Sequence, residues 1–124
     1  MKITTFNPLI VSSEADEIIS LLNELGFEKR HAPVVETGGM QVERTRMKDA
    51  NGFNVDISKV EKIPRDLCAI RMNVDDFDAA YELLSAHGFQ KAPGVEIVEL
   101  KRSKLLMMAS PSGFCIEVVQ HIKD

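Results

Sequence analysis

One short stretch of sequence occurs twice with the same turn and the same order of strand residues. Residues 49–57 read Asp-Ala-Asn-Gly-Phe-Asn-Val-Asp-Ile, and residues 111–119 read Pro-Ser-Gly-Phe-Cys-Ile-Glu-Val-Val. In both, a Gly-Phe pair leads into a strand that carries a carboxylate, Asp56 or Glu117. A second Gly-Phe pair ends a helical pattern upstream of each stretch. The chain therefore predicts two copies of one structural module.

The first copy begins with a strand at 3–11, in which Pro8 indicates an edge strand or a bulge. Ser12 or Ser13 is expected to cap the helix that follows. Its apolar residues recur at helical spacing, at Ile18, Leu21, Leu22 and Leu25. Three strands are then expected, at 31–36, 41–47 and 53–58.

The second copy repeats this order. A strand at 67–74 leads to Asp75, which is expected to cap a helix. The apolar stripe of this helix is Phe77, Ala80, Tyr81 and Leu84. A hairpin of strands at 95–100 and 104–109 and a last strand at 114–119 complete the module.

Both modules thus have the order β-α-β-β-β, and each amphipathic helix needs one apolar sheet face to cover. We predict an α+β fold of tandem βαβββ modules that form a curved mixed sheet around a central cleft, with the helices on the outer face. The whole chain, 1–124, is expected to be one domain. Module one spans 1–58, a charged linker that contains Pro64 spans 59–66, and module two spans 67–124.

Side chains alternate between the two faces of a strand, so the expected strands can be divided into two sets. The set expected under the helices is Phe53, Val55, Ile57, Ile70, Met72, Val74, Phe114, Ile116 and Val118. The set expected on the concave face is Asn54, Asp56, Ser58, Ala69, Arg71, Asn73, Cys115, Glu117 and Val119.

Composition excludes several classes of partner. The formal charge of −4 argues against binding to nucleic acid, which requires a basic surface. No run approaches the roughly 20 apolar residues of a membrane-spanning helix, and no signal-peptide pattern opens the chain. Cys68 and Cys115 lie in apolar strand patterns without metal-site spacing and are expected to be reduced core thiols. We therefore expect a cytoplasmic protein.

Two passages resemble the vicinal oxygen chelate superfamily, which includes glyoxalase I, bleomycin-resistance and fosfomycin-resistance proteins, and extradiol dioxygenases. They are 71–81, Arg-Met-Asn-Val-Asp-Asp-Phe-Asp-Ala-Ala-Tyr, and 110–117, Ser-Pro-Ser-Gly-Phe-Cys-Ile-Glu. The tandem module order extends the resemblance over essentially the whole chain. Because this scaffold serves lyases, isomerases, dioxygenases and metal-free binding proteins, the resemblance implies the fold and leaves the function to the site.

The resemblance also implies where a metal would bind. In metal-dependent members, the first strand of each module supplies a His or Gln and the last strand supplies a Glu. The last-strand positions here are Asp56 and Glu117, whereas the first-strand positions fall near Phe6 and Ala69, which cannot bind a metal. A register shifted by one residue gives Asn7 and either Cys68 or Ile70. We therefore predict no metal and no other cofactor, with a weak, water-completed site on the two carboxylates as the alternative.

Arg71 is the residue of the concave set that most requires a partner, because a guanidinium in mid-sheet is costly to bury alone. That partner is either Glu117 or Asp56 in an internal ion pair, or the carboxylate or phosphate of a ligand. The complete set of predicted ligand-binding residues is Arg71, Asp56, Glu117, Asn54, Asn73 and Phe6.

Three functions follow from these residues. The favoured one is a metal-independent small-molecule binding protein, although the absence of Trp and the single Tyr argue against antibiotic binding. The second is a lyase, isomerase or dioxygenase of the same superfamily, metal-dependent or with Asp56 or Glu117 as general base. The third is a non-catalytic interaction module. A homodimer is expected, as in many superfamily members, with the edge strand that begins at Ile3 as a contact.

Overall fold

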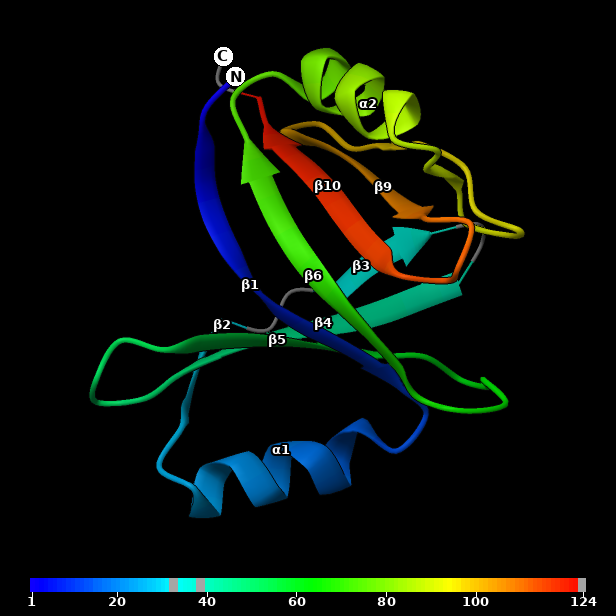
Figure 1. Ribbon diagram of the computed structural model, residues 1–124. Coiled ribbons are helices and arrows are strands. Elements are labelled where there is room, and N and C mark those ends of the chain that lie inside the picture. The colour runs from blue at the N-terminus through cyan, green and yellow to red at the C-terminus, as the bar shows by residue number, and fades with distance from the viewer. Residues whose placement is uncertain (32–33, 38–39, 123–124) are drawn as a thin grey trace. The chain divides into compact units, whose positions relative to one another are not determined.

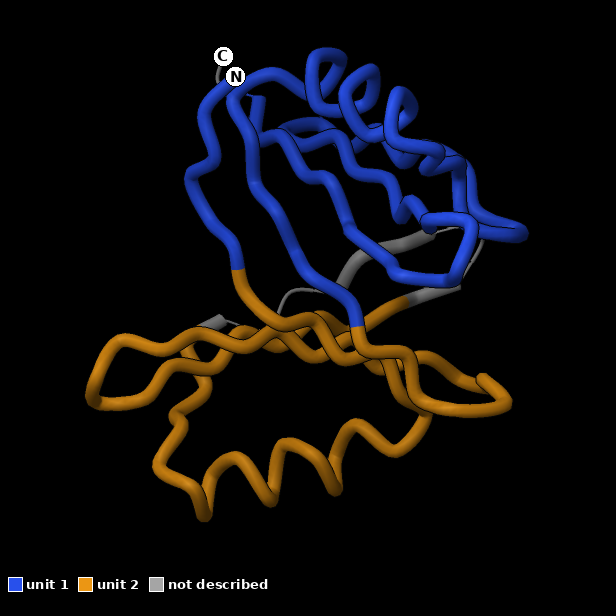
Figure 2. The backbone as a smooth tube through the Cα atoms, viewed as in Figure 1, with its two compact units in different colours: residues 1–6, 69–124 blue, residues 7–68 orange. Residues whose placement is uncertain are grey.

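The computed structural model describes residues 1–31, 34–37 and 40–122. The chain forms two compact units, coloured separately in Figure 2. Unit 2 consists of Asn7–Cys68, and unit 1 consists of Met1–Phe6 together with Ala69–Asp124. The strand that begins at Ile3 and the strand that begins at Leu67 therefore each contribute residues to both units.

Unit 2 contains one helix and the strands that surround Asp56. In chain order its elements are β1 (Ile3–Ser12), α1 (Ala15–Glu24), β2 (Glu28–His31), β3 (Val34–Thr37), β4 (Met40–Lys48) and β5 (Asn54–Lys59). The strands lie in the order β2-β4-β5-β1, and β3 also pairs with β4. β1 and β5 are parallel, whereas β4 and β5 form an antiparallel hairpin.

Unit 1 has the same element order. Its elements are β6 (Leu67–Val74), α2 (Phe77–Ala86), β7 (Gln90–Lys91), β8 (Val98–Glu99), β9 (Ser103–Ala109) and β10 (Cys115–His121). The strands lie in the order β6-β10-β9-β7, with β8 paired to β9. The first residues of β1 lie beside the end of β6, where the Asp75 amide donates to the Lys2 carbonyl at 3.1 Å.

Parallel and antiparallel pairs occur in both units, and each helix covers one face of the strands of its own unit (Figure 1). The predicted α+β class with two βαβββ modules is thus confirmed. Among the described residues, neither helix has the length and apolarity needed to cross a membrane.

Helix α2 packs as the sequence predicts. Phe77 and Ala80 are buried, and Tyr81 and Leu84 pack against the same core as Met72 of β6. The capping residue differs from the prediction, because Asp76 rather than Asp75 accepts a hydrogen bond from the Ala79 amide, at 3.0 Å. The Asp75 carboxylate accepts from the Lys2 amide instead, at 2.6 Å.

Helix α1 is rotated relative to the prediction. Leu21 and Leu25 are exposed, and the residues that face the strands are Ala15, Ile18, Ile19 and Leu22. These four have the same spacing as the α2 stripe and pack against Met47, Val55 and Ile57. The prediction was wrong because Leu21 and Leu25, which are exposed, also lie at helical spacing from Ile18.

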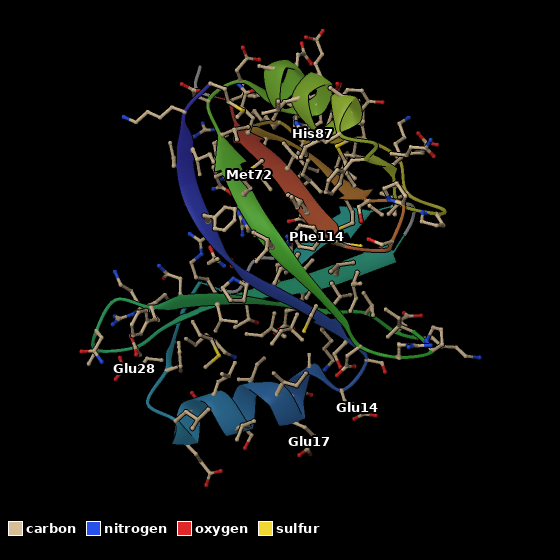
Figure 3. All side chains as sticks on the ribbon, in the orientation of Figure 1. Glu14, Glu17, Glu28, Met72, His87 and Phe114 are labelled. Atoms are coloured by element: carbon tan, nitrogen blue, oxygen red, sulfur yellow. The ribbon has the colours of Figure 1, made fainter. Side chains whose placement is uncertain are left out.

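The predicted serine cap of α1 is also wrong. The residue at the N-cap position is Glu14, which makes no capping hydrogen bond through its side chain. Ser12 instead accepts from the Glu14 amide at 2.9 Å and donates to Asp66 at 2.6 Å. Glu14 lies at the start of α1, and Glu17 points away from the strands (Figure 3).

Two of the predicted strands differ in the structure. The segment predicted as one strand at 31–36 falls on β2 and β3, which are separate strands, and the β2 pairing with β4 shifts register between Lys29 and His31. The segment predicted at 95–100 contains only the short strand β8, because a turn occupies its start. In this turn Gly94 has a positive φ, and the Val95 amide donates a hydrogen bond to the Ala92 carbonyl.

Phe53 and Phe114, predicted to lie under the helices, are exposed. Each closes the turn before its strand. The Phe53 amide donates to the Asp49 carboxylate at 2.8 Å, and the Phe114 amide donates to the Ser110 hydroxyl at 3.0 Å. Because the turn fixes the backbone of each phenylalanine ahead of the strand, strand alternation does not apply to its side chain.

The two cysteines differ in burial, and both are free thiols. Cys115 is buried as predicted, and burial raises the pKa of its thiol. Cys68 is exposed, which corrects the prediction of a core thiol. It lies two residues before Ile70, the first β6 residue that packs in the α2 core.

Candidate functional site

Each unit has one buried carboxylate on its last strand. Asp56 of β5 is 3% exposed, and Glu117 of β10 is 5% exposed. Their neighbours along the chain, such as Val55 and Ile116, pack in the helix-covered cores. Because side chains alternate along a strand, both carboxylates point to the face opposite the helix of their unit, as the sequence predicts.

Asp56 is held by side chains from both neighbouring strands. The Nδ2 atom of Asn7 in β1 donates to Asp56 Oδ2 at 2.6 Å and to the Pro8 carbonyl at 2.9 Å. The Nε atom of Arg46 in β4 donates to Asp56 Oδ1 at 3.2 Å, which forms a salt bridge. Each oxygen of the carboxylate thus has a different donor.

Sequence reasoning missed the Arg46 partner. Asn51 and Gly52 predict a hairpin, but a two-residue loop at these positions would place Met47 opposite Asp56. In the structure the loop is longer, at 49–53, and Arg46 lies opposite Asp56. The hairpin was therefore predictable from the sequence, whereas its register was not.

Two polar atoms of this cluster have no partner. Within the described part of the chain, Oδ1 of Asn7 and Nη2 of Arg46 are buried and make no hydrogen bond. Asn7 itself is 6% exposed. Buried polar atoms of native proteins are nearly always paired, so these two require an explanation.

Basic residues occupy every second position in part of β4 and therefore lie on one face of the strand. Arg44, Arg46 and Lys48 lie opposite Ser58, Asp56 and Asn54 of β5 in the antiparallel register. We call these three β4 residues the basic strip. The side-chain amide of Asn54 donates a hydrogen bond to the Gly52 carbonyl in the preceding turn, at 3.5 Å. On the other side of β4, Glu28 of β2 lies opposite Lys48.

Glu117 has a different pair of neighbours. In the strand register it lies opposite Arg71 of β6 on one side and Met107 of β9 on the other. Arg71 Nε donates to the side-chain oxygen of Asn73 at 3.1 Å, and Asn73 is buried. The structure therefore brings three predicted residues, Arg71, Asn73 and Glu117, onto adjacent strands.

The first-strand position of module one is corrected by the structure. Asn7, rather than Phe6, is the β1 residue that reaches Asp56. Phe6 is 61% exposed and belongs to unit 1. Arg71 lies opposite Glu117 in unit 1 as Leu9 lies opposite Asp56 in unit 2. Ala69, two residues before Arg71, is therefore the equivalent of Asn7. The side chain of Ala69 has no hydrogen-bond donor or acceptor.

The described donors around Asp56 do not fit a resident divalent metal. In the described ranges, no three His, Cys, Asp or Glu side chains come together. The described contacts of Asp56 include an amide nitrogen and a guanidinium, neither of which is a metal ligand. The guanidinium charge also opposes a cation at the same carboxylate.

A separate hollow of about 500 Å³ lies in unit 1, between the segment after α2 and the β9–β10 turn. Its polar lining comes from Gln90, Lys91, Ser110 and Ser112. Lys91 is paired with Glu96 at 2.9 Å, and that contact raises the pKa of the lysine. None of the predicted site residues lines this hollow.

Comparison with known proteins identifies the fold. No protein-family model matches the sequence, and no curated protein matches it at a significant level. Methylmalonyl-CoA epimerase from Mycobacterium tuberculosis is similar over 98% of this chain and 90% of its own, with a TM-score of 0.69 and 14% identity. A glyoxalase/bleomycin resistance protein/dioxygenase superfamily member from Vibrio splendidus 12B01 is similar over 96% and 99%, with a TM-score of 0.61 and 18% identity.

Glyoxalase I from Zea mays is also similar, over 98% of this chain but 44% of its own, with a TM-score of 0.63 and 15% identity. This chain thus spans less than half the length of that enzyme. At these identities the likeness establishes how the chain folds.

Proposed function

On the vicinal oxygen chelate fold, we propose that this protein binds a small organic molecule without a resident metal. Asp56 and Glu117 are the central binding groups, Arg71 provides a cation, and Asn54, Asn73 and Phe6 complete the contact set. The solved structures that share the fold support the coarser part of the proposal, a glyoxalase/bleomycin-resistance/dioxygenase-like protein.

The observation that carries the proposal is the polarity of the sheet faces opposite the helices. Charged and polar side chains are buried there in both units, and they are Asn7, Asp56, Ser58, Asn73 and Glu117. Asp and Glu are almost never buried in a protein unless they are paired or have a function. Groups of buried polar side chains on one face of a sheet are typical of ligand sites.

The proposal is tested by thermal-shift screening of small acids, amines, amides and aromatic compounds, followed by calorimetric titration of the compounds that stabilise the protein. Asp56→Asn and Glu117→Gln should each weaken binding about tenfold, because each replaces a charge-assisted hydrogen bond by a neutral one. Glu61→Gln, at an exposed loop position, is the matched control and should leave binding unchanged. A protein that binds no compound, or whose binding ignores both site variants, would refute the proposal.

An enzymatic function is the second candidate, because solved structures with this fold include a methylmalonyl-CoA epimerase and a glyoxalase I. In this case Asp56 or Glu117 would act as general base. Elemental analysis of protein purified without chelator, followed by exposure to Ni, Zn, Mn and Fe(II), separates the two candidates. Stoichiometric metal that is lost in Glu117→Gln would favour a metal-dependent lyase, isomerase or dioxygenase over the binding protein.

We further propose a cytoplasmic homodimer. The free thiols are consistent with a reducing compartment. Ile3 and Phe6 expose apolar side chains on β1 and offer a contact for a second copy. Light scattering that finds a strict monomer would exclude the dimer, and with it the non-catalytic interaction module that the sequence also allowed.

A further inference from the structure

The Arg46–Asp56 contact is incomplete in a specific way. Arginine and carboxylate often pair through two parallel hydrogen bonds. Here Arg46 Nε reaches Oδ1 of Asp56, whereas Oδ2 accepts the short 2.6 Å bond from Asn7. Asn7 thus holds the oxygen that a second guanidinium bond would use, and Arg46 Nη2 is left without a partner among the described residues.

The orientation of the Asn7 amide is fixed by its surroundings. Its nitrogen donates to two acceptors, Asp56 Oδ2 and the Pro8 carbonyl, so the nitrogen and oxygen cannot be exchanged without losing both bonds. The amide oxygen is therefore the atom that remains buried without a hydrogen bond in the described structure. The cluster offers one unused cationic donor, at Arg46, and one unused neutral acceptor, at Asn7.

The charges around the two unused atoms select the ligand further. The unused donor at Arg46 belongs to a guanidinium and therefore attracts an anion. Asp56 itself repels a second negative charge nearby, so a monoanion is favoured over a phosphate dianion. The carboxylate of Asp56 also attracts a donor placed at the Asn7 oxygen.

We infer that the ligand of this site is a small carboxylate that carries its own hydrogen-bond donor, an ammonium or a hydroxyl group. The ligand carboxylate accepts from Arg46 Nη2, and the ligand donor binds Asn7 Oδ1. The inference rests on the proposed binding function and adds the chemical class of the ligand. It also adds Arg46 and Asn7 to the binding residues predicted from the sequence.

A matched series of acids tests the inference directly. Propionate, lactate and alanine share a three-carbon skeleton and differ only in whether a hydrogen, hydroxyl or ammonium is present, and 3-hydroxypropionate and β-alanine move the donor by one carbon. Calorimetric titration of the wild-type protein should show that at least one hydroxy or amino acid binds about tenfold more tightly than propionate, because a buried acceptor is otherwise left unpaired. The donor of the tightest acid distinguishes the ammonium from the hydroxyl.

Variants then assign the two contacts. Arg46→Gln should weaken binding of every acid about tenfold or more, since it removes the cationic donor. Lys48→Gln removes the same charge from the same strand and face without a contact to Asp56 and should change binding less than about threefold. In Asn7→Ala the preference for lactate or alanine over propionate should disappear. Thermal unfolding of each variant establishes that it is folded.

Three outcomes would overturn the inference. They are equal binding of propionate and its substituted analogues, acid binding that survives Arg46→Gln, and binding of no acid at all. The proposed function fails only if the amines, amides and aromatic compounds of the wider screen also do not bind. Failure of the inference and failure of the proposed function are therefore separate results.

Discussion

The two units carry equivalent carboxylates, but the arginine beside each carboxylate lies on a different neighbouring strand. Asp56 lies between Arg46 of its antiparallel neighbour and Leu9 of its parallel neighbour. Glu117 lies between Met107 of its antiparallel neighbour and Arg71 of its parallel neighbour. Each carboxylate therefore has one arginine and one apolar residue opposite it in the register. The arginine lies on the antiparallel neighbour in unit 2 and on the parallel neighbour in unit 1.

In this fold an arginine can thus lie beside the buried carboxylate on either of its two neighbouring strands. Either neighbouring strand places a side chain directly opposite the carboxylate, on the same face of the sheet. Asp56 receives its charge from the strand before it in the hairpin, and Glu117 has its arginine on the first strand of its module.

Removing the arginine of unit 2 should have the largest effect. Arg46→Met removes the salt bridge to the Asp56 carboxylate, which is 3% exposed. We expect the free energy of unfolding to fall by about 3 kcal/mol, at the lower end of the range for a broken buried pair, because the Arg46 side chain is 32% exposed. Urea denaturation measures the change. Lys48→Met, which removes an exposed charge from the same strand, should change it by less than about 0.5 kcal/mol.

Moving the cation of unit 1 to the other strand should have an intermediate effect. Arg71→Leu is expected to lower the free energy of unfolding by about 2 kcal/mol, because Glu117 is buried beside it. Adding Met107→Arg recreates the arrangement of unit 2 and should recover about half of that loss. Met107→Arg in the presence of Arg71 is the control and should give no gain. A double variant no more stable than Arg71→Leu would show that the two strands are not interchangeable.

The helices of the two units differ in their caps, and this difference predicts smaller effects. Asp76 caps α2 through a 3.0 Å hydrogen bond from the Ala79 amide. Asp76→Ala should therefore lower the free energy of unfolding by about 1 kcal/mol. Glu82→Ala, at an exposed position within the same helix, should have little effect. Equal losses in both variants would mean that the cap contributes nothing specific.

The uncapped helix should gain from a cap. Glu14 at the N-cap of α1 makes no side-chain capping bond, so Glu14→Ser should raise the free energy of unfolding by about 0.5 kcal/mol. The same substitution at Glu17, which lies inside the first turn, should give no gain. Thermal and urea unfolding of the two variants provide the comparison. A gain at both positions would indicate a charge effect rather than capping.

The sequence by itself determined what depends on local periodicity. The two occurrences of Gly-Phe before a carboxylate-bearing strand predicted the module order, and strand alternation placed Val55, Ile57, Ile116 and Val118 under the helices. The stripe of α2 was also correct. These features follow from backbone geometry, which repeats every two residues in a strand and every 3.6 in a helix, and so are visible in one segment at a time.

Only the tertiary structure decided which side chains meet. The Arg46–Asp56–Asn7 cluster joins three strands, and its members are related by strand register rather than by spacing along the chain. The inward face of α1 was decided by packing, because Leu21 and Leu22 both fit a helical stripe and only Leu22 packs against Ile57 and its neighbours. A pattern in one segment specifies a face, whereas the partner on that face depends on the pairing of distant strands.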